Sequence, residues 1–273
     1  MAVMRFTDYA KNGILNHYFG GSAWSNTDIS KMQVGLFTAD PTSAGSTANE
    51  IGTIARQDIA FDAVSQHVIS NNADITFDTS STTNGTVATH MAVFDDHVTT
   101  PHMLCYGQLT NSITIDNTKD IVASIDGIVI GVDTNSEQTP VPEDYAFPDA
   151  IVDEILEFVF RLGTIPSQPA AWQVSLHTNE SLDGTANEWS GGNYSRQTVT
   201  WNSVSAGTGS FREVTNNGAI QFANQSQTPV AMWGIWDVTN TKFLALHDVN
   251  PDVTVVSGDN VDLADQAMKI SID

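Results

Sequence analysis

Two stretches of the sequence, ARQDIAF at Ala55–Phe61 and SRQTVTW at Ser195–Trp201, decide the fold of this chain. Each contains an Arg-Gln pair, followed by a short alternating run that ends on an aromatic residue. The chain has only ten Lys and Arg among its 273 residues, so two such pairs in matching contexts are not expected by chance. The recurrence therefore indicates that a longer unit has been duplicated.

The similarity extends on both sides of the Arg-Gln pairs, in the same order along the chain. The separation between matching residues stays between 140 (Val34 and Val174) and 145 (Phe77 and Phe222). A period of this length is too long for a solenoid repeat and is typical of two copies of a complete domain. The other matching stretches are Met32–Thr42 with Trp172–Ser181, Ser70–Phe77 with Thr215–Phe222, His90–Asp96 with Ala231–Val238, and Met103–Leu109 with Phe243–Val249.

A segment without periodicity separates the two copies. TNSEQTPVPEDYAFP, Thr134–Pro148, contains three prolines and two glutamates, a composition typical of a linker. We therefore predict a first domain over residues 1–133, a linker over 134–147 and a second domain over 148–273. Domains of roughly 130 residues are of ordinary size and can each bury a core.

Each copy is predicted to open with an amphipathic helix, because apolar residues recur at spacings of three and four. In the first copy Thr7 is the expected N-cap, and Gly20 and Gly21 are expected to end the helix. In the second copy Asp149 is the expected cap, and Gly163 is expected to end the helix.

After each helix the pattern changes to short alternating runs that are rich in Val, Ile, Phe and Thr. About seven such runs per copy are separated by Gly, Asn, Asp and Ser clusters, which favours an antiparallel sandwich or barrel. The predicted fold is therefore mainly β, with two tandem antiparallel β-sandwich domains that are each preceded by an N-terminal amphipathic helix.

The formal net charge is −22, with only ten basic residues, so the surface is expected to be acidic. This charge argues against binding to nucleic acid or to an anionic membrane surface. The sequence shows no signal peptide or membrane-spanning run, so we expect a soluble protein made in a cytoplasm. Cys105 is the only cysteine and, within an apolar run, is expected to be a small buried hydrophobic residue.

The strongest candidate for a metal site is the cluster around THMAVFDDHVTTPH. The second copy has no histidine opposite His90 or His97, so a solvated hairpin tip is favoured over a metal site. No phosphate-binding loop or nucleophile elbow is present. We therefore predict no catalytic residues, no metal and no cofactor. The members of this cluster are His90, Asp95, Asp96, His97 and His102.

The recurring arginines, Arg56 and Arg196, are predicted to be structural. Each could bind an anion, but an arginine present in both halves of an arginine-poor chain more often bridges a carboxylate. Asp95 and Asp237 also recur, and they are the expected partners. The repeated pairs singled out are Arg56, Gln57, Asp95, Arg196, Gln197 and Asp237.

Tryptophans are concentrated in the second copy. Core or interface packing is the favoured role for such alternating aromatics. The alternative is an exposed platform for a glycan, for which Trp189 and Trp236 are the candidates. The second-copy tryptophans are Trp172, Trp189, Trp201, Trp233 and Trp236.

The first copy resembles the tail-fibre-type virion structural proteins of tailed bacteriophages, over nearly all of residues 6–133. The second copy keeps YSRQTVTW but lacks the Tyr106-Gly107 pair and has SLHTNES in place of GLFTADP, which suggests a different contact. The stretches that carry the resemblance are FTDYAKNGILNHYFGGSAW, VGLFTADPTSAG, IARQDIAF, SNNADITF, THMAVFDD and LCYGQLT.

This resemblance implies a non-enzymatic virion structural protein, tail- or fibre-associated, that is assembled in the host cytoplasm and binds other virion proteins. A homo-oligomer is expected. One alternative is a capsid decoration or cement protein on the outer surface of the head. The further alternatives are a module that binds a host surface glycan and a hydrolase for a host surface polymer.

Overall fold

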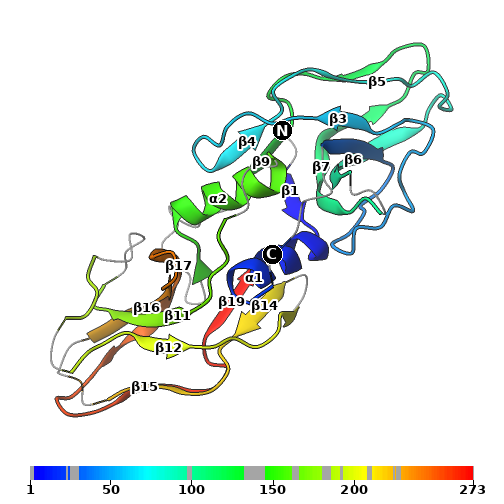
Figure 1. The fold of residues 1–273 in the computed structure, drawn as a ribbon. Helices are drawn as coiled ribbons and strands as arrows, with labels where there is room; N and C mark the ends of the chain where they lie inside the picture. Colours follow the sequence, from blue (N-terminus) through cyan, green and yellow to red (C-terminus); the bar gives the residue numbers. More distant parts are fainter. Residues whose placement is uncertain are drawn as a thin grey trace.

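The structure of the chain is a computed structural model (Figure 1). It describes residues 3–22, 24, 31–96, 100–131, 145–161, 166–179, 186–190, 193–207, 211–223, 225 and 229–272. Across these ranges, no helix has the length and apolar character needed to cross a membrane.

The described chain is mainly β and consists of two sets of elements in the same order. The first copy comprises β1 (Val3–Phe6), α1 (Asp8–Tyr18), β2 (Met32–Phe37), β3 (Gln57–Ile59), β4 (Val68–Ser70), β5 (Ile75–Phe77), β6 (Val87–Asp95), β7 (Met103–Thr114), β8 (Ile121–Ala123) and β9 (Val129–Gly131). The second copy comprises β10 (Tyr145–Ala146), α2 (Asp149–Phe160), β11 (Trp172–His177), β12 (Gln197–Val199), β13 (Ser205–Ala206), β14 (Arg212–Thr215), β15 (Ile220–Phe222), β16 (Pro229–Asp237), β17 (Lys242–Thr254), β18 (Val261–Leu263) and β19 (Lys269–Ile272).

Each copy is built on an open antiparallel sheet of five strands. The order is β1-β7-β6-β2-β3 in the first copy and β10-β17-β16-β11-β12 in the second. The remaining strands form short ribbons (β4-β9, β5-β8, β15-β18) and a three-stranded sheet (β13-β14-β19) rather than a second continuous layer. The mainly β, antiparallel prediction is confirmed. A closed barrel is wrong because the sheets are open, and the predicted β-sandwich is found only in part because separate ribbons stand in place of a second sheet. Because β10 starts at Tyr145, a strand also lies within the predicted linker range.

The duplication includes the irregularities of the sheets. The register between β6 and β7 shifts at Val93/Phe94, and the register between β16 and β17 shifts at Ile235/Trp236, which are matching positions. Bulges of this kind bend a strand and are conserved devices of a fold. Their recurrence shows that the two sheets are shaped alike.

The helix starts are set by different residues in the two copies. Thr7 is the N-cap of α1, as predicted, because its Oγ1 accepts a hydrogen bond from the amide of Ala10 at 3.3 Å. The prediction for Asp149 is wrong, since Asp149 is the first residue of α2 and Pro148 occupies the cap position without a side-chain bond. Proline before the first helical residue still sets a suitable backbone angle. Gly163 lies outside the described residues.

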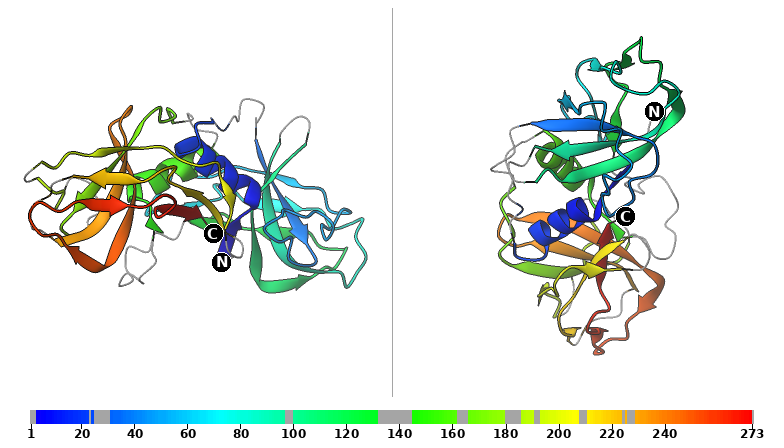
Figure 2. Two further views of the ribbon diagram at one scale, coloured as in Figure 1. Left: turned by 90° about the horizontal axis from the view of Figure 1, so that it is seen from below. Right: turned by 90° about the vertical axis from the view of Figure 1, so that its right-hand side faces the viewer.

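The two helices reach across to the opposite copies. α1 packs against β14 and β19 of the second copy as well as against β1 and β7 of its own, and α2 packs against β4 of the first copy. Figure 1 shows the helices side by side at the centre of an elongated body, with the five-stranded sheets at opposite ends. Both further views agree that the helices lie between the two sheets (Figure 2).

The exchange of α2 is anchored by an aromatic side chain at its last turn. The ring of Phe160 stacks on Phe6 of the first copy at a centroid distance of 5.9 Å. It also meets the edge of Phe61, again in the first copy, at 5.8 Å. Phe160 therefore fills a position in the core of the other copy.

Phe19, at the end of α1, makes the reciprocal contacts in the second copy. Its ring lies 6.5 Å from Phe147 and 5.3 Å from Trp201. Buried apolar residues from both copies form one continuous core that includes both helices. The two copies thus share a core, and each helix places its last phenylalanine against matching aromatic residues of the other copy.

His17 of α1 is fully buried at this junction, where it packs against Tyr18 and Phe158 of α2. Burial lowers the pKa of His17 below its ordinary value of 6.5, and the positive charge of Lys242 acts in the same direction, whereas Glu154 opposes it.

We expect the free energy of unfolding to fall as the pH drops below about 6.5, because the unfolded chain then binds a proton that the buried imidazole does not. Urea unfolding at pH 7.5 and at pH 5.5 measures this difference. The variant His17→Phe, which copies the phenylalanine at the matching position of α2, should reduce it. An equal pH dependence in the variant would contradict the assignment to His17.

Candidate functional site

Arg56 is held in a cluster next to β3. Its Nε and Nη2 donate to Oε1 and Oε2 of Glu50 at 2.7 and 2.8 Å, which is a bidentate ion pair. The guanidinium carbon lies 3.4 Å from the ring centroid of Phe94 on β6, a cation–π contact. Arg56 therefore joins the Glu50 loop, β3 and β6.

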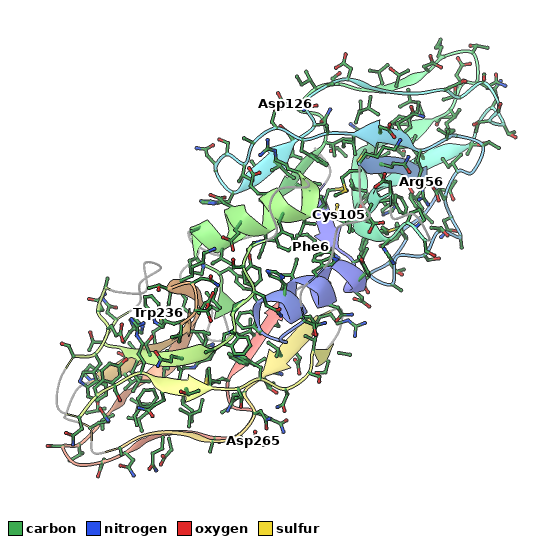
Figure 3. The ribbon with its side chains drawn as sticks, in the orientation of Figure 1. Phe6, Arg56, Cys105, Asp126, Trp236 and Asp265 are labelled. Carbon is green, nitrogen blue, oxygen red and sulfur yellow. The ribbon has the colours of Figure 1, made fainter. Side chains whose placement is uncertain are left out.

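Arg196 forms the same cluster in the second copy. Its Nε and Nη2 donate to the two carboxylate oxygens of Glu188 at 2.8 and 2.7 Å. The guanidinium carbon lies 3.6 Å from the ring centroid of Trp236, which occupies the position of Phe94. Figure 3 shows Arg56 and Trp236 in opposite halves of the body. The structural prediction for both arginines agrees with this geometry.

The predicted partners of the arginines are wrong. Asp95 is buried and accepts the amide of His102 at 2.6 Å, with its second oxygen 3.0 Å from Nδ1 of the same histidine. Asp237 accepts the amides of Thr239 and Asn240 at 2.8 and 3.1 Å. Both aspartates therefore close hairpins, between β6 and β7 and between β16 and β17.

The repeated glutamines brace the backbone beside each arginine. Nε2 of Gln57 donates to the carbonyl of Ala55 at 2.9 Å, and Nε2 of Gln197 donates to the carbonyl of Ser195 at 2.7 Å. The Arg-Gln pair thus helps to fix the start of β3 and of β12.

The carboxylate of Glu188 is stabilised in its charged form. Burial opposes ionisation, but hydrogen bonds from Arg196 and Tyr194 outweigh it and hold the pKa of Glu188 below its ordinary value. Burial also raises the pKa of the Tyr194 hydroxyl, which donates to Oε1 of Glu188 at 2.9 Å. A charged, fully bonded carboxylate of this kind is a structural group rather than a general acid.

Two buried asparagines, one in each copy, make a matching set of hydrogen bonds to the backbone. Asn71 donates to the carbonyls of Ala73 and Ser124 at 2.8 and 2.9 Å and accepts the amide of Ile128 at 2.7 Å. Asn216 makes the matching bonds in the second copy. The repeated Asn-Asn motif was the available signal, and its role is to hold two backbone segments together.

The histidine-rich hairpin brings together only some of its candidates. His102 pairs with Asp95 and stacks on Tyr9 of α1 at a centroid distance of 4.0 Å. His97 lies outside the described residues, and among those that are described no group of three or more metal-ligand residues occurs. His90 Nδ1 lies 2.8 Å from the hydroxyl of Thr89.

The glycan-platform alternative is wrong for both tryptophans that were its candidates. Trp189 and Trp236 are each only 5% exposed. Trp189 stacks on Tyr194 at 6.0 Å, and the indole of Trp236 donates to Ser175 at 3.0 Å. Both rings therefore pack within the second copy, which is the role that the sequence favoured. Cys105 is also buried as expected, and burial raises the pKa of its thiol.

The basic residues serve mainly within the chain. Eight of the ten basic residues form ion pairs with carboxylates of the same chain, and because each pair also neutralises one acidic residue, the formal net charge of −22 rests on the other carboxylates. The paired basic residues are Lys31, Arg56, Lys119, Arg161, Arg196, Arg212, Lys242 and Lys269.

The outer ribbons of the two copies differ at matching positions. In the first copy, Val122 and Ile125 are 54% and 53% exposed. The matching positions of the second copy are Asp262 and Asp265, which accept hydrogen bonds from Gln221 and Gly218 at 2.8 Å each. Figure 3 labels Asp126 and Asp265, which lie on opposite sides of the molecule. The duplicated frame therefore presents two different outer surfaces.

A comparison with known protein families also divides the chain into two copies. The family model described as podophage GP4 fiber I protein gp80 matches the chain twice, over residues 5–131 and 146–271. No curated protein matches the sequence. The two matched regions coincide with the two copies of the fold and together cover most of the chain.

Proposed function

Because this chain belongs to the podophage GP4 fiber I protein gp80 family, we propose that it is a non-enzymatic structural component of a phage tail or tail fibre. The family takes its name from a fibre protein, which supports a structural role in a virion. The observation that carries the proposal is the double match, because two fibre-family units are joined here through one shared core.

The architecture suits a connector between other virion proteins. A shared core and exchanged helices make a two-unit body that resists hinge motion between the units. At matching positions, the outer ribbon of the first copy carries the exposed Val122 and Ile125, and that of the second copy carries Asp262 and Asp265. A rigid body whose two copies differ at these positions can bind a different partner through each copy.

The charge of the molecule indicates what one kind of partner surface is like. With a formal net charge of −22 and its basic residues largely paired, the chain favours a basic patch on a neighbouring virion protein. Such an association is weakened by salt, because exposed charges are screened within about 8–10 Å at moderate ionic strength.

The proposal is tested on purified virions from the source phage. We expect quantitative mass spectrometry to find the chain at a small number of copies per particle, and electron microscopy to place it on the tail. Particles from which the gene has been deleted are the control and should lose that density. Absence of the chain from purified particles would contradict a virion role altogether.

The second candidate function is decoration of the capsid surface. It is favoured by the same rigid acidic body and predicts hundreds of copies per particle, distributed over the head. Oligomer formation is part of both proposals and is measured by light scattering of the purified chain. Turnover of a host surface polymer by that chain would instead favour the hydrolase alternative.

A further inference from the structure

The surface of the second copy that receives α1 is built for that helix. Arg212 of β14 pairs with Asp8 at the start of α1, with Nη2 and Oδ2 2.7 Å apart. At the other end of the helix, the indole of Trp172 on β11 donates to the carbonyl of Tyr18 at 2.7 Å. The tyrosine hydroxyl donates to Glu154 at 2.9 Å. Both ends of α1 therefore contact residues of the second copy, while the amide of Asp8 also donates to the carbonyl of Ser43 in the first copy at 2.7 Å.

The surface of the first copy that receives α2 is built in a comparable way. The amide of Val64 donates to Glu157 at 3.1 Å, and His67 lies 2.9 Å from Asp153. Beside Phe160, the guanidinium of Arg161 donates to the carbonyl of Phe61 at 3.4 Å. The end of α2 thus contacts Phe61 twice: Arg161 donates to its carbonyl, and Phe160 packs against its ring.

Each helix would leave an apolar surface behind if it were removed. Ile14 and Leu15 of α1 and the matching Ile155 and Leu156 of α2 are all essentially unexposed. Net domain stability is small compared with the burial of several such side chains. A single copy with its helix withdrawn would therefore expose much of its core.

We propose that neither copy is a complete folding unit, and that the helix-receiving surface of each copy is a binding site for the helix of the other copy. The chain is then a covalently closed, helix-exchanged dimer of the family unit. The inference concerns the chain itself and holds whether the protein sits on the tail or on the head.

The two receiving surfaces have different specificities. By strand register, His67 of the first copy stands where Arg212 stands in the second, and Met32 stands where Trp172 stands. A first-copy surface therefore offers α1 neither the guanidinium for Asp8 nor the indole for the Tyr18 carbonyl. Pairing of unlike copies is favoured over pairing of like copies, so the partner is a second-copy unit.

The test uses the full chain with a site-specific protease sequence inserted between residues 137 and 138. After cleavage, we expect the two fragments to elute together from a sizing column at micromolar concentration, with the mass of the intact 29.4 kDa chain apart from the insert. Elution as two separate fragments, folded or unfolded, would overturn the proposal.

Exchanging the charges of Asp8 and Arg212 between the two fragments tests whether their ion pair contributes to the association. Asp8→Arg in one fragment, or Arg212→Asp in the other, should each weaken association by about tenfold, since each places like charges together in a partly buried pair. Mixing the two variant fragments should restore it. Failure of the mixture to recover would show that Asp8 and Arg212 do not meet across the copies.

The matched control is Lys269→Glu, which breaks an ion pair with Glu213 that lies inside the second copy. Any loss of association caused by this variant should not be restored by Asp8→Arg in the other fragment. Restoration by Asp8→Arg would indicate a general charge effect and would also overturn the proposal.

Discussion

Replacing Phe160 with alanine is expected to lower the free energy of unfolding by about 3–5 kcal/mol, the usual cost of removing a buried phenylalanine. The ring is fully buried between Phe6 and Phe61, both of which belong to the other copy. Because the core is shared, we expect one cooperative transition in urea that moves as a whole. Five of the six tryptophans lie in the second copy, so fluorescence follows that copy while circular dichroism follows both.

The matched control is Phe211→Ala, since this phenylalanine is 42% exposed and should change stability by no more than about 0.5 kcal/mol. Coincident fluorescence and dichroism curves for Phe160→Ala would support a single cooperative unit. Two separate transitions, of which only the second-copy one is shifted, would show that the copies unfold independently and that Phe160 does not stabilise the first.

The duplication and the strand pattern could be predicted because both are local properties of the sequence. Matching stretches such as Ala55–Phe61 and Ser195–Trp201 preserve the alternation of apolar and polar residues that is typical of a strand. This pattern can be recognised without knowing where the strand lies in the fold. Thr7 could likewise be predicted as a cap, since its bond to Ala10 is made within one turn.

The helix exchange could not be predicted, because an apolar helix face indicates burial without indicating the surface that covers it. Ile14 and Leu15 would be equally buried against the strands of either copy. The choice depends on paired contacts such as that of Arg212 with Asp8. These contacts join residues about 200 positions apart, and nothing in the local sequence links them.

The partner of each arginine was missed although the sequence carries a signal for it. Glu50 and Glu188 each end a TANE tetrapeptide, at residues 47–50 and 185–188. Asp95 and Asp237 recur as well, in longer matching strands, and the comparison of strands favoured the aspartates. In the folded chain the loops before β3 and β12 bring the glutamates to the guanidinium groups, and the aspartates are used at the hairpins.

The arginine cluster leads to the second large expected effect. Arg196→Ala should destabilise the chain by about 2–3 kcal/mol, because it leaves the largely buried Glu188 carboxylate without its bidentate partner. It also removes the contact with the Trp236 ring. Urea unfolding at pH 7 measures the loss. Lys119→Ala, which breaks an exposed ion pair with Asp116, is the control and should cost no more than about 0.5 kcal/mol.

The dependence of this loss on pH separates the ion pair from simple packing. The pKa of Glu188 is lower in the folded chain than its ordinary value of 4.5, so the stability from its charged form is present above pH 4.5 and is lost as the pH falls through the folded pKa. The difference between the wild-type chain and Arg196→Ala should therefore shrink in acid. A difference that is constant from pH 7 to pH 3 would mean that Arg196 acts through its contact with Trp236 and not through Glu188.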